Sequence, residues 1–288
     1  MLKLLERNIA AIDERLMLLA PSPQAVPDDF ANVTFDSSLH AQLMRELQQL
    51  RGSVYLEDGA VQRRELTPDG LHRTPEDQRS WHLLMQGKDG RISACAWYLE
   101  HSAEASIQDL RVRNCPLGGS SEWRDTLVGA VDAEIARAGS EKLHYAEVGG
   151  WAVSRACRCT SEGLLLALAA YSLGRRLGGV LGITTATVRH SSSTILRRLG
   201  GTSLEFDGRV VPSYFDPKYN CEMELLRFDS RRPNRKYAGL VELLRERLSN
   251  VTVVAGDIAE SVYGAGLPSR VAPAAVGRAR FREPVLVA

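Results

Sequence analysis

The stretch from Ser161 to Leu177 is apolar around almost its whole circumference when it is drawn as a helix. Such a helix has no side suited to water, so it has to be buried against another layer of structure. It runs into Val180 to Val188, which is rich in β-branched residues, and it follows a second β-like segment, Leu143 to Val148. Together these segments predict a strand, helix, strand unit, and therefore an α/β fold.

Hydrophobic periodicity extends this unit along the chain. The predicted helices are Leu2 to Leu19, Ser37 to Leu50, Glu122 to Ala138, a short one from Ser191 to Gly200, and Tyr237 to Leu248. The predicted strands are Ser53 to Leu56, Trp81 to Gln86, Arg91 to Glu100 and Cys221 to Phe228. Gly87 to Gly90 joins two of these strands as an antiparallel hairpin, and the Gly149-Gly150 pair at the end of another strand indicates a bulge.

These elements divide the chain into three parts. Residues 1–50 read as an N-terminal helical extension, residues 51–250 as the α/β domain, and residues 251–288 as a C-terminal tail with little periodicity. The two helices of the extension can pack on the core or on a second copy of the chain, so a homodimer is one expectation.

Composition excludes several classes of partner. The 288 residues include 36 basic and 35 acidic side chains, a formal net charge of +1 that attracts neither nucleic acid nor an anionic membrane. The longest strongly apolar run, Leu164 to Ala170, is too short to cross a bilayer. The five cysteines lack CxxC spacing and the first residues lack a signal-peptide pattern, so we expect a reducing, cytoplasmic location and no metal site.

Glu147 is the first candidate for chemistry. It shares a strand face with Leu143 and Tyr145, where a carboxylate is unfavourable to bury unless it is paired or protonated. A group of this kind suits a general base that takes a proton from an amine before the amine attacks a thioester. The alternative is a carboxylate that faces water or pairs with an arginine.

The segment Arg158 to Gly163, directly before the buried helix, is the second candidate. Thr160 or Ser161 can cap the helix, and Gly163 lets the backbone approach a ligand. Free N–H groups at a helix start favour a phosphate, and Arg158 would add a charge-assisted contact. The alternative is a capped helix that binds nothing.

With the hairpin before them and the strand after the helix, these two segments resemble the GCN5-related N-acetyltransferase (GNAT) superfamily. That family carries the signature Gln/Arg-x-x-Gly-x-Gly/Ala between a strand and the following helix, and Arg158-x-x-Ser161-x-Gly163 matches it with serine at the middle glycine. The resemblance implies an acyl-CoA N-acyltransferase fold with a mixed central sheet splayed at a bulge and flanked by helices. It also implies that Thr160, Gly149 and Gly150 help to hold the acyl-CoA or the phosphopantetheine arm of an acyl-carrier protein.

Within the superfamily the chain resembles the bacterial acyl-homoserine-lactone synthases and N-acyl amino acid synthases. Glu147-Val-Gly-Gly-Trp-Ala-Val153 keeps the glutamate and the Ala-Val of the lactone synthases and loses their Ser-Arg pair. The resemblance therefore implies transfer of a fatty acyl group to the amine of an amino acid or similar small molecule. The alternatives are a non-catalytic acyl-thioester-binding module, which the altered loop serine favours, and a lactone synthase that uses S-adenosylmethionine.

Aromatic residues complete the expected site. Trp81, His82 and Trp151 are candidates for the acceptor pocket, although Trp81 and His82 can equally form an aromatic lid on the core with a solvated histidine. The family's usual tyrosine, which protonates the leaving thiolate, has no counterpart in Ser191 to Leu199. Tyr214 is a possible substitute, and packing is its alternative role.

Overall fold

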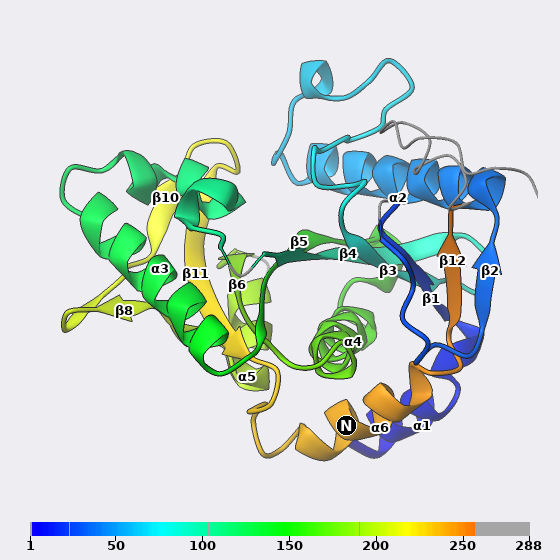
Figure 1. Cartoon of the computed structure of the whole chain (residues 1–288). Coiled ribbons are helices and arrows are strands. Elements are labelled where there is room, and N and C mark those ends of the chain that lie inside the picture. The colour runs from blue at the N-terminus through cyan, green and yellow to red at the C-terminus, as the bar shows by residue number, and fades with distance from the viewer. Residues whose placement is uncertain (1, 23, 103, 190, 257–288) are drawn as a thin grey trace, which may run out of the picture.

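The computed structural model describes residues 2–22, 24–102, 104–189 and 191–256, which build a mixed sheet with helices on both faces (Figure 1). The helices are α1 (Leu2–Ala10), α2 (Ser37–Glu57), α3 (Arg124–Ser140), α4 (Glu162–Arg176), α5 (Ser192–Leu199) and α6 (Ala238–Arg247). The strands are β1 (Leu16–Leu19), β2 (Val33–Phe35), β3 (Trp81–Gln86), β4 (Ile92–His101), β5 (His144–Val153), β6 (Val180–Thr187), β7 (Thr202–Ser203), β8 (Glu205–Phe206), β9 (Arg209–Val210), β10 (Tyr214–Asp216), β11 (Cys221–Asp229) and β12 (Thr252–Ala255). Short 3-10 turns lie between them, among them η4 (Arg111–Asn114) and η6 (Arg155–Cys157).

The main sheet has the order β10–β11–β6–β5–β4–β3–β1–β12–β2, with β7 paired to β11 beside this path. Neighbours are antiparallel except for β5 with β6, β1 with β12 and β12 with β2. The pairing of β5 with β6 ends at Val148 and Thr184, although both strands continue. The expected fold class, α/β with a mixed sheet that splays at its centre, is confirmed.

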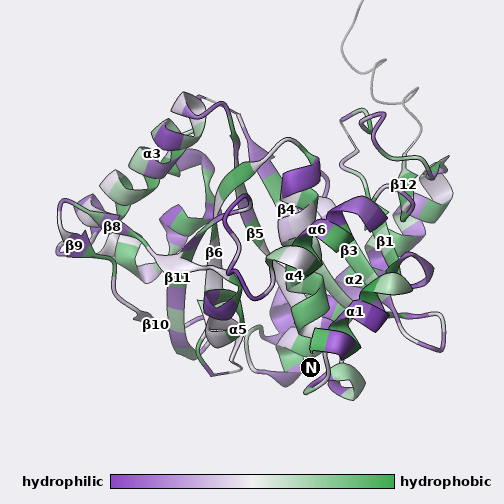
Figure 2. Ribbon diagram, turned by 90° about the horizontal axis from the view of Figure 1, so that it is seen from below, coloured by the Kyte–Doolittle hydropathy of each residue, from purple (hydrophilic) through white to green (hydrophobic). Residues whose placement is uncertain are grey.

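Alternate residues of the central strands face two different helical layers. Tyr98 and Ala146 pack with α4, and the cluster around them also takes in α1 and α6 (Figure 2). Cys95 packs with α2 on the other face, and Tyr145 packs there with α3. Side chains alternate between the two faces of a strand, and here helices cover both faces. Each central strand is therefore a continuous apolar run in the sequence instead of an alternating one.

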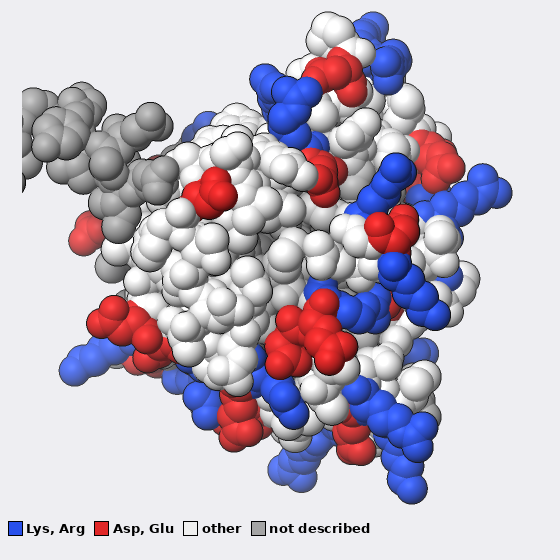
Figure 3. All heavy atoms as spheres, turned by 90° about the vertical axis from the view of Figure 1, so that its right-hand side faces the viewer, with Lys and Arg blue, Asp and Glu red and all other residues white. Residues whose placement is uncertain are grey.

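The surface beside the edge strand β2 carries charges of both signs. Figure 3 shows Lys and Arg interspersed with Asp and Glu around an uncharged area on this side. No single sign dominates this face, in keeping with the balanced composition. Among the described residues, no helix has the length and apolar character needed to cross a membrane.

Several predicted elements are confirmed. The strand predicted over Trp81–Gln86 is β3 itself, and the fully apolar helix is α4, which begins one residue later than expected. The predicted bulge is present, because the register between β4 and β5 shifts between Cys95 and Trp97. The Asp207-Gly208 turn joins β8 and β9, with both turn residues at positive φ.

Two predictions near the N-terminus are wrong. The first helix ends at Ala10, and Leu16–Leu19 forms strand β1 between β12 and β3. A short run that is apolar on every side cannot be assigned to helix or strand by periodicity, and here pairing on both edges decides it. Ser53 to Leu56 is the last part of α2 rather than a strand, since Val54 continues the buried stripe of Leu43 and Leu47.

The boundaries expected after residues 50 and 250 fall within one continuous structure. Residue 50 lies inside α2, and β1 and β12 stand side by side in the main sheet. The segments assigned to an extension and a tail therefore both contribute strands to the core. The rest of the predicted tail, residues 257–288, lies outside the described residues.

Candidate functional site

The splayed strands open onto a cavity of about 1090 Å³. Its wall includes residues of β5 and β6 beyond their last pair, the first half of α4, and the loops before β3 and after β4. Three regions of different chemistry line it: the start of α4, an apolar arm, and a charged end.

The bulge in β5 holds an indole ring. Trp97 of β4, buried, lies against Gly149 and Gly150, and a Cβ atom at either glycine would overlap the ring. Gly150 also has φ of +62°, a backbone conformation that favours glycine. All three residues line the cavity.

The start of α4 forms one end of the cavity. Gly163 faces Trp151, and a Cβ on Gly163 would lie 3.2 Å from Cζ2 of that indole. Trp151 Nε1 is buried and has no hydrogen-bond partner among the described residues. Thr160 caps the helix, its hydroxyl accepting a hydrogen bond from the Glu162 N–H at 3.2 Å. Gly163, Trp151 and Thr160 all line the cavity.

Two residues of the predicted phosphate loop make contacts that the sequence did not suggest. The Arg158 guanidinium lines the cavity and forms ion pairs with Asp58 at 3.0 Å and Glu57 at 3.4 Å, both at the end of α2. Ser161 is not among the cavity residues; its hydroxyl accepts a hydrogen bond from Asn8 Nδ2 at 3.1 Å. The helix start turns the Ser161 side chain towards α1, which corrects its predicted place in the binding loop.

The apolar arm runs along α4. Small and aliphatic side chains of this helix face α5 and β11 across the cavity, and they end near Tyr171, whose ring lies 5.4 Å from that of Phe228. The residues that line this arm are Leu166, Ala167, Ala170, Ile195, Leu196 and Phe228. An apolar wall of this kind fits a hydrocarbon chain.

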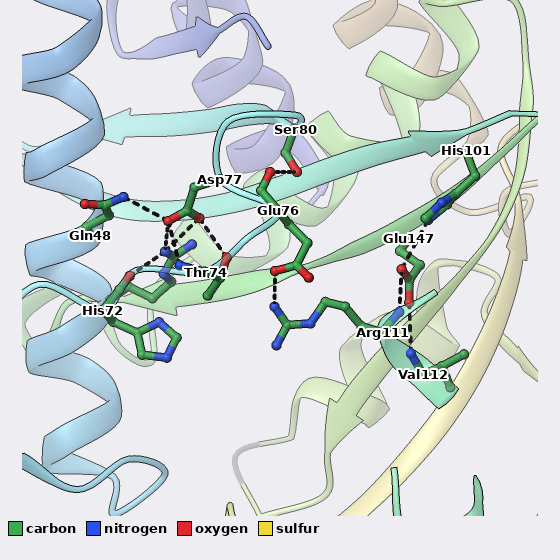
Figure 4. A network of polar contacts seen from close by, with 11 residues as sticks. Gln48, His72, Thr74, Glu76, Asp77, Ser80, His101, Arg111, Val112 and Glu147 are labelled. Carbon is green, nitrogen blue, oxygen red and sulfur yellow. Dashed lines mark hydrogen bonds and ion pairs between the residues drawn. The ribbon is translucent and has the colours of Figure 1, made fainter. Parts of the chain in front are cut away.

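At the charged end, Glu147 is held by three donors. Its Oε2 accepts hydrogen bonds from the backbone N–H of Arg111 at 3.0 Å and from His101 Nε2 at 3.1 Å, and its Oε1 accepts one from the Val112 N–H at 3.2 Å. The side chain is 5% exposed and lines the cavity (Figure 4). Glu147 thus fixes the η4 turn against β5, a structural task that the strand pattern did not reveal.

A buried ion pair anchors the opposite wall. Arg51 of α2 lies 2.8 Å from both carboxylate oxygens of Asp77, and the same guanidinium donates to the His72 carbonyl at 2.6 Å (Figure 4). Gln48 and the backbone N–H of Thr74 also donate to Asp77, at 2.9 and 3.0 Å. Full satisfaction of the carboxylate makes this loop a rigid support for its neighbour, Glu76.

The two walls meet in a second ion pair. Arg111, positioned by Glu147, extends across the charged end so that its Nη1 lies 2.5 Å from Glu76 Oε2 (Figure 4). Its guanidinium also lies 5.7 Å from the centre of the Trp97 ring, within reach of a cation–π contact. Sequence reasoning missed Glu76, Arg111 and Trp97. Arg111 lies in a non-periodic segment, while Glu76 could have been noticed beside Asp77.

Trp81 and His82 lie outside the cavity, contrary to their predicted role in the acceptor pocket. Trp81 is buried and stacks on Phe30 with ring centres 5.5 Å apart. His82 is 1% exposed, its Nε2 lies 2.8 Å from the Asp77 carbonyl, and burial lowers its pKa to about 4. The reason is topological: β3 is two strands away from β5 and the splay.

Tyr214 does line the cavity. Burial, reinforced by the nearby Cys115 and Asp216, raises the pKa of its phenol. Tyr55 and Tyr219 line the same end, and burial raises the pKa of each. These phenols therefore keep their protons at neutral pH. Among the described residues, no group of three or more His, Cys, Asp or Glu side chains could hold a metal ion.

No protein-family model matches the chain, and no curated protein is similar to it in sequence. Solved structures with related folds include a CoA-dependent acyl-homoserine lactone synthase, BjaI, with SAM and isopentyl-CoA, which is 13% identical at a TM-score of 0.48 over 86% of this chain and 99% of that one. The lactone synthase LasI is 16% identical at a TM-score of 0.46, over 69% of this chain and 87% of that one. FeeM, an N-acyl amino acid synthase from uncultured soil microbes, is 11% identical at a TM-score of 0.42, over 72% of this chain and 94% of that one.

These are the two groups that the sequence itself resembles. Identities this low and TM-scores below 0.5 say nothing of substrate. The function proposed below therefore rests on the cavity of this chain.

Proposed function

We propose that this protein is an N-acyltransferase that moves a medium or long acyl chain from a thioester to the amine of a small molecule such as an amino acid. The observation that carries the proposal is the three-part cavity. One continuous space joins a capped helix start, an apolar arm and a charged end, with the β5 bulge between them. An acyl thioester has the same three parts in its pantetheine arm, its hydrocarbon tail and its reactive carbonyl.

In this proposal the pantetheine arm lies along the β5 bulge. The Trp97 ring packs against Gly149 and Gly150, and all three residues line the cavity, so the arm would contact this indole and the glycine backbone beside it. The phosphate end lies at the start of α4, where helix N–H groups and the unpartnered Trp151 Nε1 can donate hydrogen bonds. Arg158, Arg155 and Arg189 add positive charge around this mouth and interact with the end of α2.

The donor is acyl-CoA or acyl-carrier protein. Both carry phosphopantetheine, which is the chemistry that the start of α4 suits. An acidic carrier protein would need free surface arginines, and Arg175, Arg176 and Arg197 are instead engaged by Glu242, Arg245 O and Glu224. Arg158 and Arg189 at the mouth are also engaged, by the end of α2, but they line the cavity and are therefore the candidates for contact with either donor.

In the reaction, the amine attacks the thioester carbonyl and the thiolate leaves. Tyr214, whose phenol stays protonated in the cavity, is the candidate proton donor to that thiolate. Glu147 is proposed to act as a positioning residue, since its carboxylate holds the Arg111 and Val112 amides. A lactone synthase is disfavoured because Gly149 and Gly150 stand where that family has Ser and Arg, and Trp97 occupies the space above them.

The test is a thiol-release assay on the purified full chain. Acyl-CoA and acyl-carrier protein of several chain lengths are offered with a panel of amino acids, and products are identified by mass spectrometry. N-acyl amino acid formation with stoichiometric thiol release is the expected result. Tight thioester binding without thiol release would instead indicate the non-catalytic binding module, and a lactone formed from S-adenosylmethionine would indicate the lactone synthase.

A further inference from the structure

The Glu76–Arg111 ion pair joins the loop before β3 to the turn after β4 at the charged end of the cavity. Glu76 belongs to the loop before β3, which the Arg51–Asp77 pair holds rigid. Arg111 belongs to the η4 turn, which Glu147 holds through backbone N–H groups. Each partner is therefore fixed by its own support, and neither depends on the other for its position.

The carboxylates that line the cavity differ in the donors from which their oxygens accept hydrogen bonds. Those of Glu147 accept three hydrogen bonds, two of them from backbone N–H groups that cannot move away. Asp216 and Glu65 likewise accept from the backbone N–H groups of Lys218 and Gln62. Among the described residues, the Glu76 carboxylate accepts only from the Arg111 side chain, through Oε2. A substrate can displace that partner, because the Arg111 side chain is one third exposed.

The surrounding charge favours an anion beside Arg111. Arg73 and Lys218 line the same end of the cavity, and within the described ranges neither has a carboxylate at ion-pair distance. Lys218 lies instead 5.9 Å from the centre of the Tyr219 ring. A carboxylate that enters this end would therefore meet several cations, and the Glu76 carboxylate beside them is engaged by the Arg111 side chain.

From these contacts we infer that the Glu76–Arg111 pair receives the acceptor as a zwitterion: Arg111 binds its carboxylate, and the released Glu76 takes the proton from its ammonium group. This inference rests on the proposed function and assigns to Glu76 the general-base role first expected of Glu147. An α-amino acid carries one carboxylate, which can pair with Arg111, and one ammonium group, which can pair with Glu76. Its binding therefore replaces one salt bridge with two. An amine without a carboxylate leaves Glu76 engaged by Arg111 and is a poor substrate.

The ammonium group gives one proton to Glu76, and the nitrogen lone pair forms the C–N bond to the acyl carbon. The C–S bond breaks, the thiolate leaves, and it gains the second nitrogen proton through Tyr214 or solvent. The products are the N-acyl amino acid and the free thiol, and Glu76 returns its proton to solvent.

The experiment compares Glu76→Gln, Glu76→Ala and Arg111→Met with the wild type, using the best amino acid found and its decarboxylated amine. Glu46→Gln is the control, because Glu46 pairs with Gln42 on α2 outside the cavity. Glu76→Gln is expected to lower kcat about 100-fold with acyl-CoA affinity unchanged. Added formate should restore part of the activity of Glu76→Ala, which a merely structural role of Glu76 would not produce.

Arg111→Met should raise KM for the amino acid at least 10-fold and remove the preference for it over the decarboxylated amine. Activity of Glu76→Gln within threefold of the wild type, or a Glu76→Ala variant that formate does not rescue, would overturn the inference and leave the proposed function standing. Equal use of the amino acid and the decarboxylated amine by the wild type would also overturn the inference and leave the proposed function standing. A wild type that acylates no amine would overturn both.

Discussion

The indole of Trp97 lies against the backbone of Gly150, so a single added carbon at Gly150 would overlap the ring. Both residues line the cavity, and the close approach shapes the bulge at which β5 leaves β6. The geometry of the site is thus tied to the packing of one buried side chain.

Gly150→Ala should destabilise the protein by about 2 to 4 kcal/mol, because it combines overpacking with a positive φ. Urea denaturation measures the change. Gly139→Ala is the matched control, since a Cβ there has open space within α3 and should be neutral or stabilising. Adding Trp97→Ala to Gly150→Ala should recover part of the loss, and complete additivity would contradict the contact.

Removal of either partner of the buried Arg51–Asp77 pair should cause a large loss of folding stability. Arg51→Met or Asp77→Asn should each cost about 3 to 5 kcal/mol, since a buried charge or its donors would be left without a partner. Equilibrium unfolding in urea gives the value. Arg45→Met, which breaks the exposed pair with Asp69, should leave stability nearly unchanged. Equal effects at the two sites would contradict the role of burial.

Stability should fall on mild acidification. Burial lowers the pKa of His82 to about 4, below its ordinary 6.5, so the folded state holds this ring neutral while the unfolded state takes up a proton. The contribution of His82 to the free energy of unfolding is fully present above pH 6.5 and is lost as the pH falls towards 4. At roughly 1.4 kcal/mol per pKa unit, the loss is at most about 3 kcal/mol. His72, whose pKa burial also lowers to about 4, adds in the same direction.

Unfolding free energies at pH 7.5 and pH 5.0 test this prediction. His82→Gln should reduce the difference in unfolding free energy between the two pH values. An unchanged pH dependence in His82→Gln would show that other groups are responsible.

The apolar arm predicts a change in chain-length preference. Ala167→Phe places a ring in the channel along α4, so the preferred acyl chain should shorten by several carbons. Leu196→Ala, on the opposite wall, should lengthen it or leave it unchanged. Competition binding with acyl-CoA of increasing length measures both, and identical length profiles in the two variants would place the tail elsewhere.

Trp151→Phe removes a buried N–H that has no hydrogen-bond partner within the part of the chain that the structure describes. Stability should therefore hold or improve slightly, because an unsatisfied donor is lost. Donor affinity should fall about 3- to 10-fold if that N–H hydrogen-bonds the pantetheine arm. Urea denaturation measures the change in stability, and isothermal titration with CoA measures the change in affinity. Unchanged affinity would remove Trp151 from the proposed donor site.

The sequence by itself determined the α/β class, the buried helix α4, strand β3 and the bulge at Gly149-Gly150. Each is governed by local chemistry: apolar residues on every side of a helix, β-branched runs, or a glycine pair. Neighbouring residues along the chain carry this information, so no knowledge of distant contacts is needed.

Only the tertiary structure decided which charged residues meet in the cavity. Glu76 and Arg111 are 35 residues apart, and their pairing depends on two separate anchors, Asp77 with Arg51 and Glu147 with the η4 amides. The same holds for β1, whose short apolar run becomes a strand because β12 and β3 pair with it on either side. Periodicity reports which face of an element is buried, whereas pairing across long separations is set by the packing of the whole sheet.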